Sequence, residues 1–286
     1  MTNAVATPAP EERFARNVVW ITGASSGIGA ALAVELASAG ARLVLSARRE
    51  DRLQAVREEC IAAGAAADDV LVQPLDVADT ESMPAVVETV LGRYGQVDLL
   101  INNAGISQRS ACLNTELSVY RRLFEVDVLG QIALTKLVLP SMVARGQGHV
   151  AVTASVAGKV GAPLRTGYCA AKHAVMGFFD ALRTEVAHLG VQVTTIVPGY
   201  IRTDIARQAL TGSGAAAGDI EDDVDNGMDV VECARVIVQG FCRGTEEIEV
   251  GSGPEMGLLE MKRKDPVGTF RLLEQMAAEA LQRSLP

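Results

Sequence analysis

The chain has 286 residues, of which 49% are hydrophobic and 21% charged, with 27 glycines. This composition is typical of a globular protein with a large buried core, and it excludes a disordered or collagen-like chain. Acidic residues outnumber basic ones by 35 to 26, which gives a formal net charge of −9. Because a protein must present Lys and Arg to replace counterions on a phosphate backbone, the charge argues against nucleic acid as a partner.

The five cysteines are scattered along the chain and never stand in a C-x-x-C spacing. This pattern favours a reducing compartment over a disulfide framework, and the three histidines lack ligand spacing, so we predict no metal site. Apolar runs are shorter than the roughly 18 residues that a membrane span needs. The first 16 residues lack the basic-then-apolar order of a secretory signal. We therefore predict a cytoplasmic protein without a membrane span, with a disordered lead-in over residues 1–16.

Short β-branched runs alternate with longer segments rich in Ala and Leu, which predicts a parallel sheet with crossover helices. The expected strands are residues 18–22, 42–47, 70–75, 98–102, 149–154, 191–197 and 248–251. The expected helices include residues 29–39, 52–63, 83–94, 119–143 and 169–189, several of them followed by a capping glycine. Because neither an internal repeat nor a linker interrupts this order, we predict one α/β domain over residues 17–253. It would be a doubly wound parallel sheet of about seven strands with helices on both faces.

Two segments depart from the alternation. Residues 204–229 combine small residues with an acidic cluster, and they predict a surface excursion that serves either as a substrate lid or as a solvated loop. The acidic cluster consists of Asp219, Glu221, Asp222, Asp223 and Asp225. Residues 254–286 have the pattern of an amphipathic helical tail, to which the sequence assigns no function.

A glycine-rich turn, T-G-A-S-S-G-I-G over residues 22–29, follows the first expected strand and leads into a helix. Gly23 suits a tight turn, Gly27 permits close approach of a pyrophosphate, and Gly29 permits helix and strand to pack closely. The helix N-terminus would face the phosphates. The turn therefore predicts a dinucleotide site that also includes Ser25, Ser26 and Ile28.

The same residues contain G-A-S-S-G, which fits the G-x-S-x-G nucleophile elbow of a hydrolase with Ser25 as nucleophile. A hydrolase of that type needs strands before the elbow, and an acid and a histidine on later loops. Here the elbow follows the first strand. His173 and His188 fall within an expected helix, and His149 begins a strand. The context favours dinucleotide binding.

The end of the second expected strand bears on the choice of cofactor. It reads Leu45-Ser-Ala-Arg48-Arg49, with no acid before Glu50. An acid at this position would bind a ribose 2′-hydroxyl, whereas an arginine accommodates a 2′-phosphate. The two arginines equally suit a solvated helix start, but the missing acid favours NADP over NAD as the cofactor.

Tyr168 and Lys172 stand four residues apart, on one face of an expected helix. An ammonium beside a phenol favours loss of the phenolic proton, so Tyr168 could act as a general acid or base. Such a pair alone is more often an exposed surface pair without a catalytic role. However, Ser155 follows the fifth strand, and several other motifs also follow strands, at the edge where ligands bind in open α/β sheets. These motifs are the glycine turn, Asp76, the N-N-A-G run at 102–105 and Pro198-Gly199.

With these residues the sequence resembles the classical short-chain dehydrogenase/reductase family over about residues 18–203. The matching motifs are TGASSGIG at 22–29, LDV at 75–77, NNAG at 102–105, Ser155, Tyr168-x-x-x-Lys172 and PGYIRT at 198–203. The stretches ALTKLVLPSM at 133–142 and GYCAAKHAVMGFFDALRTE further resemble the member-7-type subgroup. The resemblance implies a Rossmann-like fold and NADP-dependent interconversion of a secondary alcohol and a ketone or aldehyde.

The resemblance also implies roles for individual residues. Tyr168 would exchange a proton with the substrate oxygen, Lys172 would bind the nicotinamide ribose and assist Tyr168, and Ser155 would hold the substrate oxygen. Two long helices, over 131–143 and 169–189, would pair copies into a homodimer or homotetramer. The remaining cofactor contacts would come from Asp76 and Val77 at the adenine, Asn103, Ala104 and Gly105 along the adenosine side, and Pro198, Gly199, Ile201 and Thr203 near the carboxamide.

One position departs from the family pattern. Where family members carry an Asn that holds a water beside the lysine, this chain has Asp127. An ionised Asp cannot donate a hydrogen bond, and its charge opposes phenolate formation, so we predict that Asp127 ion-pairs with Lys172 and shifts the pH dependence. The departure keeps two alternatives open. One is a catalytically weak NADP-binding sensor or scaffold, and the other is an epimerase or dehydratase of the same fold.

Overall fold

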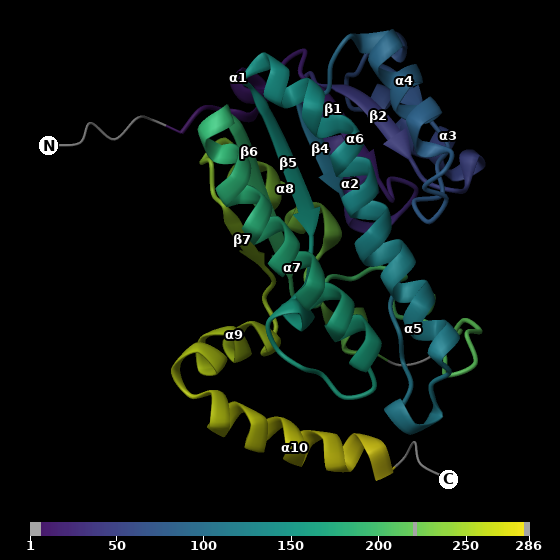
Figure 1. Ribbon diagram of the computed structural model, residues 1–286, viewed down its shortest axis with the longest axis vertical. Helices are drawn as coiled ribbons and strands as arrows, with labels where there is room; N and C mark the ends of the chain where they lie inside the picture. Colours follow the sequence, from purple (N-terminus) through teal and green to yellow (C-terminus); the bar gives the residue numbers. More distant parts are fainter. Residues whose placement is uncertain (1–6, 220–221, 283–286) are drawn as a thin grey trace, which may run out of the picture.

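A computed structural model of the protein describes residues 7–219 and 222–282. Its core is a seven-stranded, all-parallel sheet in the order β3-β2-β1-β4-β5-β6-β7 (Figure 1). The strands are β1 Val18–Thr22, β2 Arg42–Ser46, β3 Val70–Val72, β4 Leu99–Asn102, β5 Gly148–Thr153, β6 Val191–Pro198 and β7 Glu247–Val250. The prediction of a single α/β domain with a doubly wound parallel sheet is confirmed.

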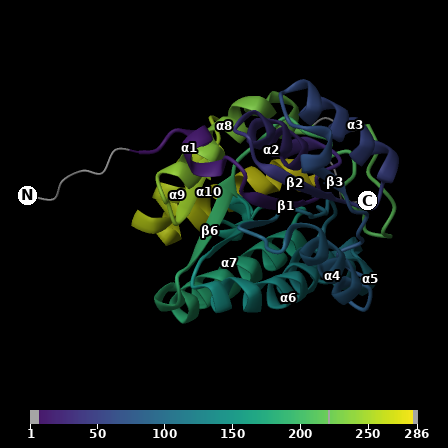
Figure 2. The same ribbon diagram turned by 90° about the horizontal axis from the view of Figure 1, so that it is seen from above.

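Helices cover both faces of the sheet (Figure 2). Along β1, Val19 and Ile21 pack with helices α2, α3 and α8, whereas Val18 and Trp20 pack with α4, α6 and α7. Both faces are buried, which is why the central strands are continuous apolar runs. The helices are α1 Pro10–Phe14, α2 Gly27–Ser38, α3 Glu50–Ala62, α4 Met83–Tyr94, α5 Leu117–Phe124, α6 Gly130–Arg145, α7 Thr166–Val186, α8 Val230–Cys242, α9 Glu255–Lys264 and α10 Pro266–Gln282.

The strand order reverses beside β1, which pairs with β2 on one side and β4 on the other. The crossover connections from these neighbours leave toward opposite faces, so a crevice opens at the carboxyl ends of the strands. The glycine turn after β1 and the Asn103–Gly105 run after β4 both lie at this crevice. The topology thus brings together motifs that stand about 80 residues apart in sequence.

The N-terminal segment differs from the prediction. Residues 10–14 form helix α1, and the Phe14 side chain is fully buried in the cluster beneath α2 and α8. The prediction of a disordered lead-in over residues 1–16 is therefore wrong for the residues of α1, because burial of the Phe14 ring stabilises the ordered segment. Residues 1–6 of that prediction lie outside the described part of the chain.

The long helix expected over residues 119–143 extends from Leu117 to Arg145. It consists of α5 and α6, which are joined without a break by a π-helical turn at Glu125–Leu129. By length and mean hydropathy this stretch would be able to cross a membrane, but half of its apolar window is buried within the protein. It packs against α4 and β5, as a core helix does.

On α7, Phe179 is also buried in the core, whereas Phe178 is partly exposed. Association of copies through α6 and α7 stays a prediction.

The acidic segment over residues 204–229 is not wholly solvated. The Asp222 side chain is 2% exposed and forms ion pairs with Arg109 and Arg165, at 2.7 Å from the latter. Val224 is also buried, so the alternative of a solvated loop is wrong at these positions. Two arginines compensate the cost of burying this carboxylate. Glu221 of the predicted acidic cluster lies outside the described residues.

Candidate active site

A cavity of about 560 Å³ runs along the carboxyl ends of the strands and is lined by most of the predicted site residues. Gly29 and Asp127 are the two that do not line it. The predicted site residues that line the cavity are Gly23, Ser25, Ser26, Gly27, Ile28, Arg48, Arg49, Asp76, Val77, Asn103, Ala104, Gly105, Ser155, Tyr168, Lys172, Pro198, Gly199, Ile201 and Thr203.

The glycine turn has a backbone conformation that residues with a Cβ atom rarely adopt. Gly23 and Gly27 adopt left-handed φ angles of +65° and +57°, which favour glycine. A Cβ on Gly29 would clash with the carbonyl oxygen of Gly23 and with the amide of Asn103. Asn103 in turn donates a hydrogen bond to the Thr22 carbonyl, at 3.1 Å, and joins the loops after β1 and β4. The backbone at the start of α2 is thereby held open toward the cavity, and this cradle fits a pyrophosphate.

The other end of this cradle is basic. Arg48 and Arg49 are exposed at the cavity wall, and neither forms an ion pair within residues 7–219 and 222–282. Arg49 is held loosely, 3.4 Å from the Ser25 hydroxyl. Asp76 lies 3.5 Å from Arg122, a further lining cation that the sequence analysis did not single out. The arrangement offers guanidinium groups to a ribose phosphate.

Tyr168 and Lys172 project from α7 into the buried part of the cavity, with residue exposures of 9% and 3%. The Lys172 Nζ donates to the Thr153 carbonyl at 3.0 Å and lies 5.6 Å from the centre of the Tyr168 ring. Ser155 caps the turn Val156–Gly158 after β5, with its Oγ accepting from the amide of Ala157 at 3.1 Å. The three side chains that the sequence predicted as catalytic therefore line one cavity.

Asp127 lies in the π-helical turn between α5 and α6, a kind of turn that often marks functional sites. Its carboxylate is fully buried, with Oδ1 accepting from the amide of Ile106 at 2.8 Å and Oδ2 lying 3.2 Å from the Lys172 Nζ. Burial raises the pKa of Asp127, against the opposing effect of Lys172. Burial, the largest single effect, would lower the pKa of Lys172, but Asp127 and Tyr168 together outweigh it and raise that pKa. Lys172 is thus held as a cation by a buried partner.

A sequence model of the family described as short chain dehydrogenase matches residues 17–213. The chain belongs to this family. Dehydrogenase/reductase SDR family member 7 from Homo sapiens is 38% identical over 275 residues, which are 96% of this chain and 81% of that protein. Dehydrogenase/reductase SDR family protein 7-like from Drosophila melanogaster is 44% identical over 234 residues, 82% and 72% of the two chains. The resemblance to member-7-type proteins is confirmed.

Solved structures agree with this assignment. A short chain dehydrogenase/reductase from Burkholderia phymatum in complex with NAD has a TM-score of 0.77 and 26% identity, and covers 88% of this chain and 94% of its own. An alcohol dehydrogenase from the archaeon Thermococcus sibiricus, complexed with 5-hydroxy-NADP, has a TM-score of 0.70 and 28% identity, with coverages of 83% and 97%. This short-chain dehydrogenase therefore belongs to an oxidoreductase family whose members bind nicotinamide dinucleotides.

The hydrolase alternative lacks its partners in this short-chain dehydrogenase. All three histidines are described, and none of them lines the cavity that contains Ser25. His149 lies buried at the start of β5, where its Nε2 is 2.9 Å from the Thr194 hydroxyl. Burial lowers the pKa of His149 to about 3. The G-A-S-S-G sequence therefore serves the turn into α2, not a nucleophile elbow.

Some cavity residues were missed because they lie outside recognisable motifs. Arg165 precedes α7 and pairs with Asp222, which lies 57 residues later in the chain. Sequence spacing gives no signal for such a contact. The amphipathic pattern of the tail indicated a packed face but not the surface that it covers. The missed lining residues include Arg122, Arg165, Glu255, Leu258, Leu273 and Met276.

Asp127→Asn is expected to shift the pH dependence of this short-chain dehydrogenase. The substitution removes a negative charge 3.2 Å from Lys172, so the lysine cation favours loss of the Tyr168 proton more strongly. Alcohol oxidation, for which the sequence predicts Tyr168 as the base, should then rise at a pH lower by about one unit. The rate of carbonyl reduction declines as the pH rises and the phenol loses its proton. In the variant this decline should begin at a correspondingly lower pH. Profiles of kcat/KM against pH, measured for alcohol oxidation and for carbonyl reduction, test this expectation. Profiles that match those of the wild type would contradict it.

Proposed function

We propose that the protein is an NADP-dependent oxidoreductase that interconverts a secondary alcohol and a ketone by hydride transfer. The observation that carries the proposal is one continuous cavity. It joins a phosphate cradle at Gly23–Gly27 and two exposed arginines to the Ser155, Tyr168 and Lys172 side chains. A dinucleotide that spans this cavity would place its reactive ring beside the hydroxyls that can exchange a proton.

The chain's own residues perform the proton chemistry. The nicotinamide ring, when bound, supplies a hydride for reduction or accepts one for oxidation. Tyr168 donates its phenolic proton to the carbonyl oxygen during reduction and takes the hydroxyl proton during oxidation, while Ser155 hydrogen-bonds to the same oxygen. Lys172 stabilises the phenolate that remains after proton donation, and Asp127 holds Lys172 in its charged form.

NADP is the proposed form of the cofactor, because Arg48 and Arg49 lie in the turn between β2 and α3, where a 2′-phosphate would lie. Replacing both with Ala should lower kcat/KM for NADPH by about 10- to 100-fold, the loss of charge-assisted hydrogen bonds, and should change kcat/KM for NADH by less than about threefold. Arg52→Ala on α3 is the matched control, since Arg52 is exposed but does not line the cavity. Equal losses for NADPH and NADH would contradict the assignment.

The proposed activity is tested by measuring consumption of NADPH and NADH with a panel of steroids, retinoids, aromatic ketones and sugars. Net oxidation of NADPH coupled to formation of an alcohol supports an oxidoreductase. Binding of NADPH without any Tyr168-dependent turnover would instead identify a sensor or scaffold. Conversion without net cofactor consumption would identify an epimerase or dehydratase.

A further inference from the structure

The C-terminal helices form a wall of the cavity. Figure 1 shows α9 and α10 crossing the end of the molecule beyond the carboxyl ends of the strands. Leu258 of α9 and both Leu273 and Met276 of α10 line the cavity. Leu259 is buried in a cluster with Val156 and other residues that flank Ser155. The tail, to which the sequence assigned no function, therefore supplies apolar surface on the substrate side of Ser155.

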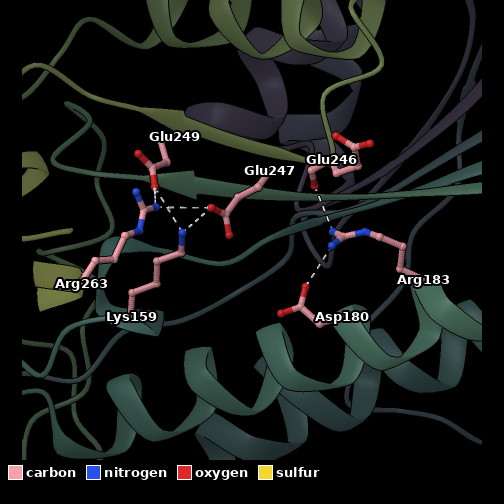
Figure 3. A network of polar contacts seen from close by, with 7 residues as sticks. All are labelled: Lys159, Asp180, Arg183, Glu246, Glu247, Glu249 and Arg263. Carbon is pink, nitrogen blue, oxygen red and sulfur yellow. Dashed lines mark hydrogen bonds and ion pairs between the residues drawn. The ribbon is translucent and has the colours of Figure 1, made fainter. Parts of the chain in front are cut away.

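A charged network fixes α9 to the edge of the sheet (Figure 3). Lys159 and Arg263 both pair with Glu247 and Glu249 on β7, with Lys159 lying 3.2 Å from Glu249 and Arg263 lying 3.7 Å from Glu247. Lys159 directly follows the turn that Ser155 caps. The network thus ties α9 and the loop after β5 to the same strand, and gives the tail a defined position at the cavity.

Glu255, the first residue of α9, has a buried carboxylate with an unused acceptor. Its Oε1 accepts from the amide of Tyr200 at 2.8 Å, and the residue is only 5% exposed. Its Oε2 is buried and has no hydrogen-bond partner among the described residues. Gly199 and Gly253 leave the space that the carboxylate fills, because a Cβ at either position would clash with it. A buried acceptor without a donor typically costs about 1–3 kcal/mol, so the geometry favours a ligand that supplies one.

The charges near Glu255 define which ligands fit. Asp223 and Asp204 also line the cavity, and the nearby cation Arg165 is engaged by Asp222 and the Ser107 hydroxyl. The unpaired arginines Arg48 and Arg49 belong to the proposed cofactor end of the cavity. Beside Glu255, a carboxylate on the substrate would meet further acids, whereas a hydroxyl would find an acceptor. Apolar side chains from α9 and α10 would surround the rest of the molecule.

We propose that Glu255 is a specificity-determining residue that accepts a hydrogen bond from a second hydroxyl on the substrate. This inference rests on the proposed function, because it takes the reacting oxygen to lie at Ser155 and Tyr168. The substrate class is an apolar alcohol or ketone that carries a hydroxyl away from the reacting carbon. Anionic substrates are disfavoured.

Matched ketones test the inference. The probes are 4-cyclohexylcyclohexanone, its analogues with a hydroxyl at the 3- or 4-position of the distal ring, and its distal carboxylic acid. Their affinities for the complex of the full chain with NADP⁺ are measured by calorimetry, and kcat/KM with NADPH is measured alongside. Glu255→Gln keeps an oxygen for the Tyr200 amide but replaces the second acceptor with a donor. Glu260→Gln, at an exposed position of α9, is the control.

In the wild type, at least one hydroxyketone should bind about 10-fold or more tightly than the parent ketone, and the acid should bind more weakly than the parent. In Glu255→Gln the amide can still donate to the hydroxyl oxygen, but this neutral hydrogen bond is weaker than one to a carboxylate, so the preference for the hydroxyl should fall by about fivefold or more. The affinity for the parent ketone should stay within about twofold, and Glu260→Gln should change neither. Equal affinities in the wild type, absence of binding by every probe, or equal losses for parent and hydroxyketone would overturn the inference. A change confined to NADP⁺ affinity would overturn it too. If the hydroxyketone is preferred in binding but neither ketone is reduced, the proposed function fails while the assignment of Glu255 stands.

Discussion

Tyr168→Phe is expected to lower kcat for carbonyl reduction by about 10³-fold, within the range that a positioned general acid contributes. The substitution removes only the phenolic hydroxyl. The ring is largely buried and packs with Leu123, Ala157 and Cys169, and these contacts survive in the variant. The thermal midpoint and the NADPH affinity should therefore stay close to those of the wild type. Single-turnover kinetics with NADPH measure the effect on the chemical step.

Tyr120→Phe is the matched control for this result. Tyr120 lies on α5, and its hydroxyl is 2.8 Å from that of Thr166, but the residue does not line the cavity. Its substitution should leave kcat within about twofold of the wild type, as surface changes usually do. A Tyr168→Phe variant with a wild-type rate, or one whose loss Tyr120→Phe equals, would contradict the role assigned to Tyr168.

Lys172→Met is expected to destabilise the fold as well as the site. The variant leaves the Asp127 carboxylate fully buried without its cation, and breaking a buried ion pair in this way costs about 3–5 kcal/mol. The double variant Lys172→Met with Asp127→Asn carries no buried charge at either position. It should recover most of the lost free energy of unfolding, which urea denaturation near neutral pH would measure.

The pH dependence of that loss has a defined sign. In Lys172→Met, burial raises the pKa of Asp127 without an opposing cation, so the folded state binds a proton more readily than the unfolded chain. The destabilisation should then be largest above neutral pH and should shrink as the pH falls and Asp127 takes up a proton. Equal losses for the single and the double variant, or a loss that grows toward acid pH, would contradict the buried pair as its source.

The architecture of the sheet was predictable because it depends on local patterns. β-Branched runs that are buried on both faces remain continuously apolar in the sequence, and β1 has the bounds predicted for it. The convergence of the glycine turn, Ser155 and Pro198-Gly199 was predictable as well, because carboxyl ends of parallel strands share one edge. Lys172 and Asp127 were expected to pair from a single departure in a motif, and the structure places them 3.2 Å apart.

The features that were not predictable depend on contacts between distant segments. Phe14 is buried by helices that follow it in the chain, and Asp222 is enclosed by Arg109, 113 residues before it. Glu255 approaches Tyr200 only because α9 folds back over the end of β6. The amphipathic pattern of such segments indicates that one face packs, but it does not identify the surface against which it packs.

Transfer of an isotope from the cofactor to the product distinguishes hydride transfer from binding of the cofactor alone. NADPH carrying deuterium at the transferable C4 position is incubated with the protein and a ketone that it reduces or, failing one, with each member of the carbonyl panel. We expect mass spectrometry to find one deuterium on the carbinol carbon of the alcohol product, and we expect Tyr168→Phe to abolish its formation on the same timescale. A product alcohol without deuterium, or bound NADPH that transfers no deuterium to any carbonyl tested, would contradict hydride transfer.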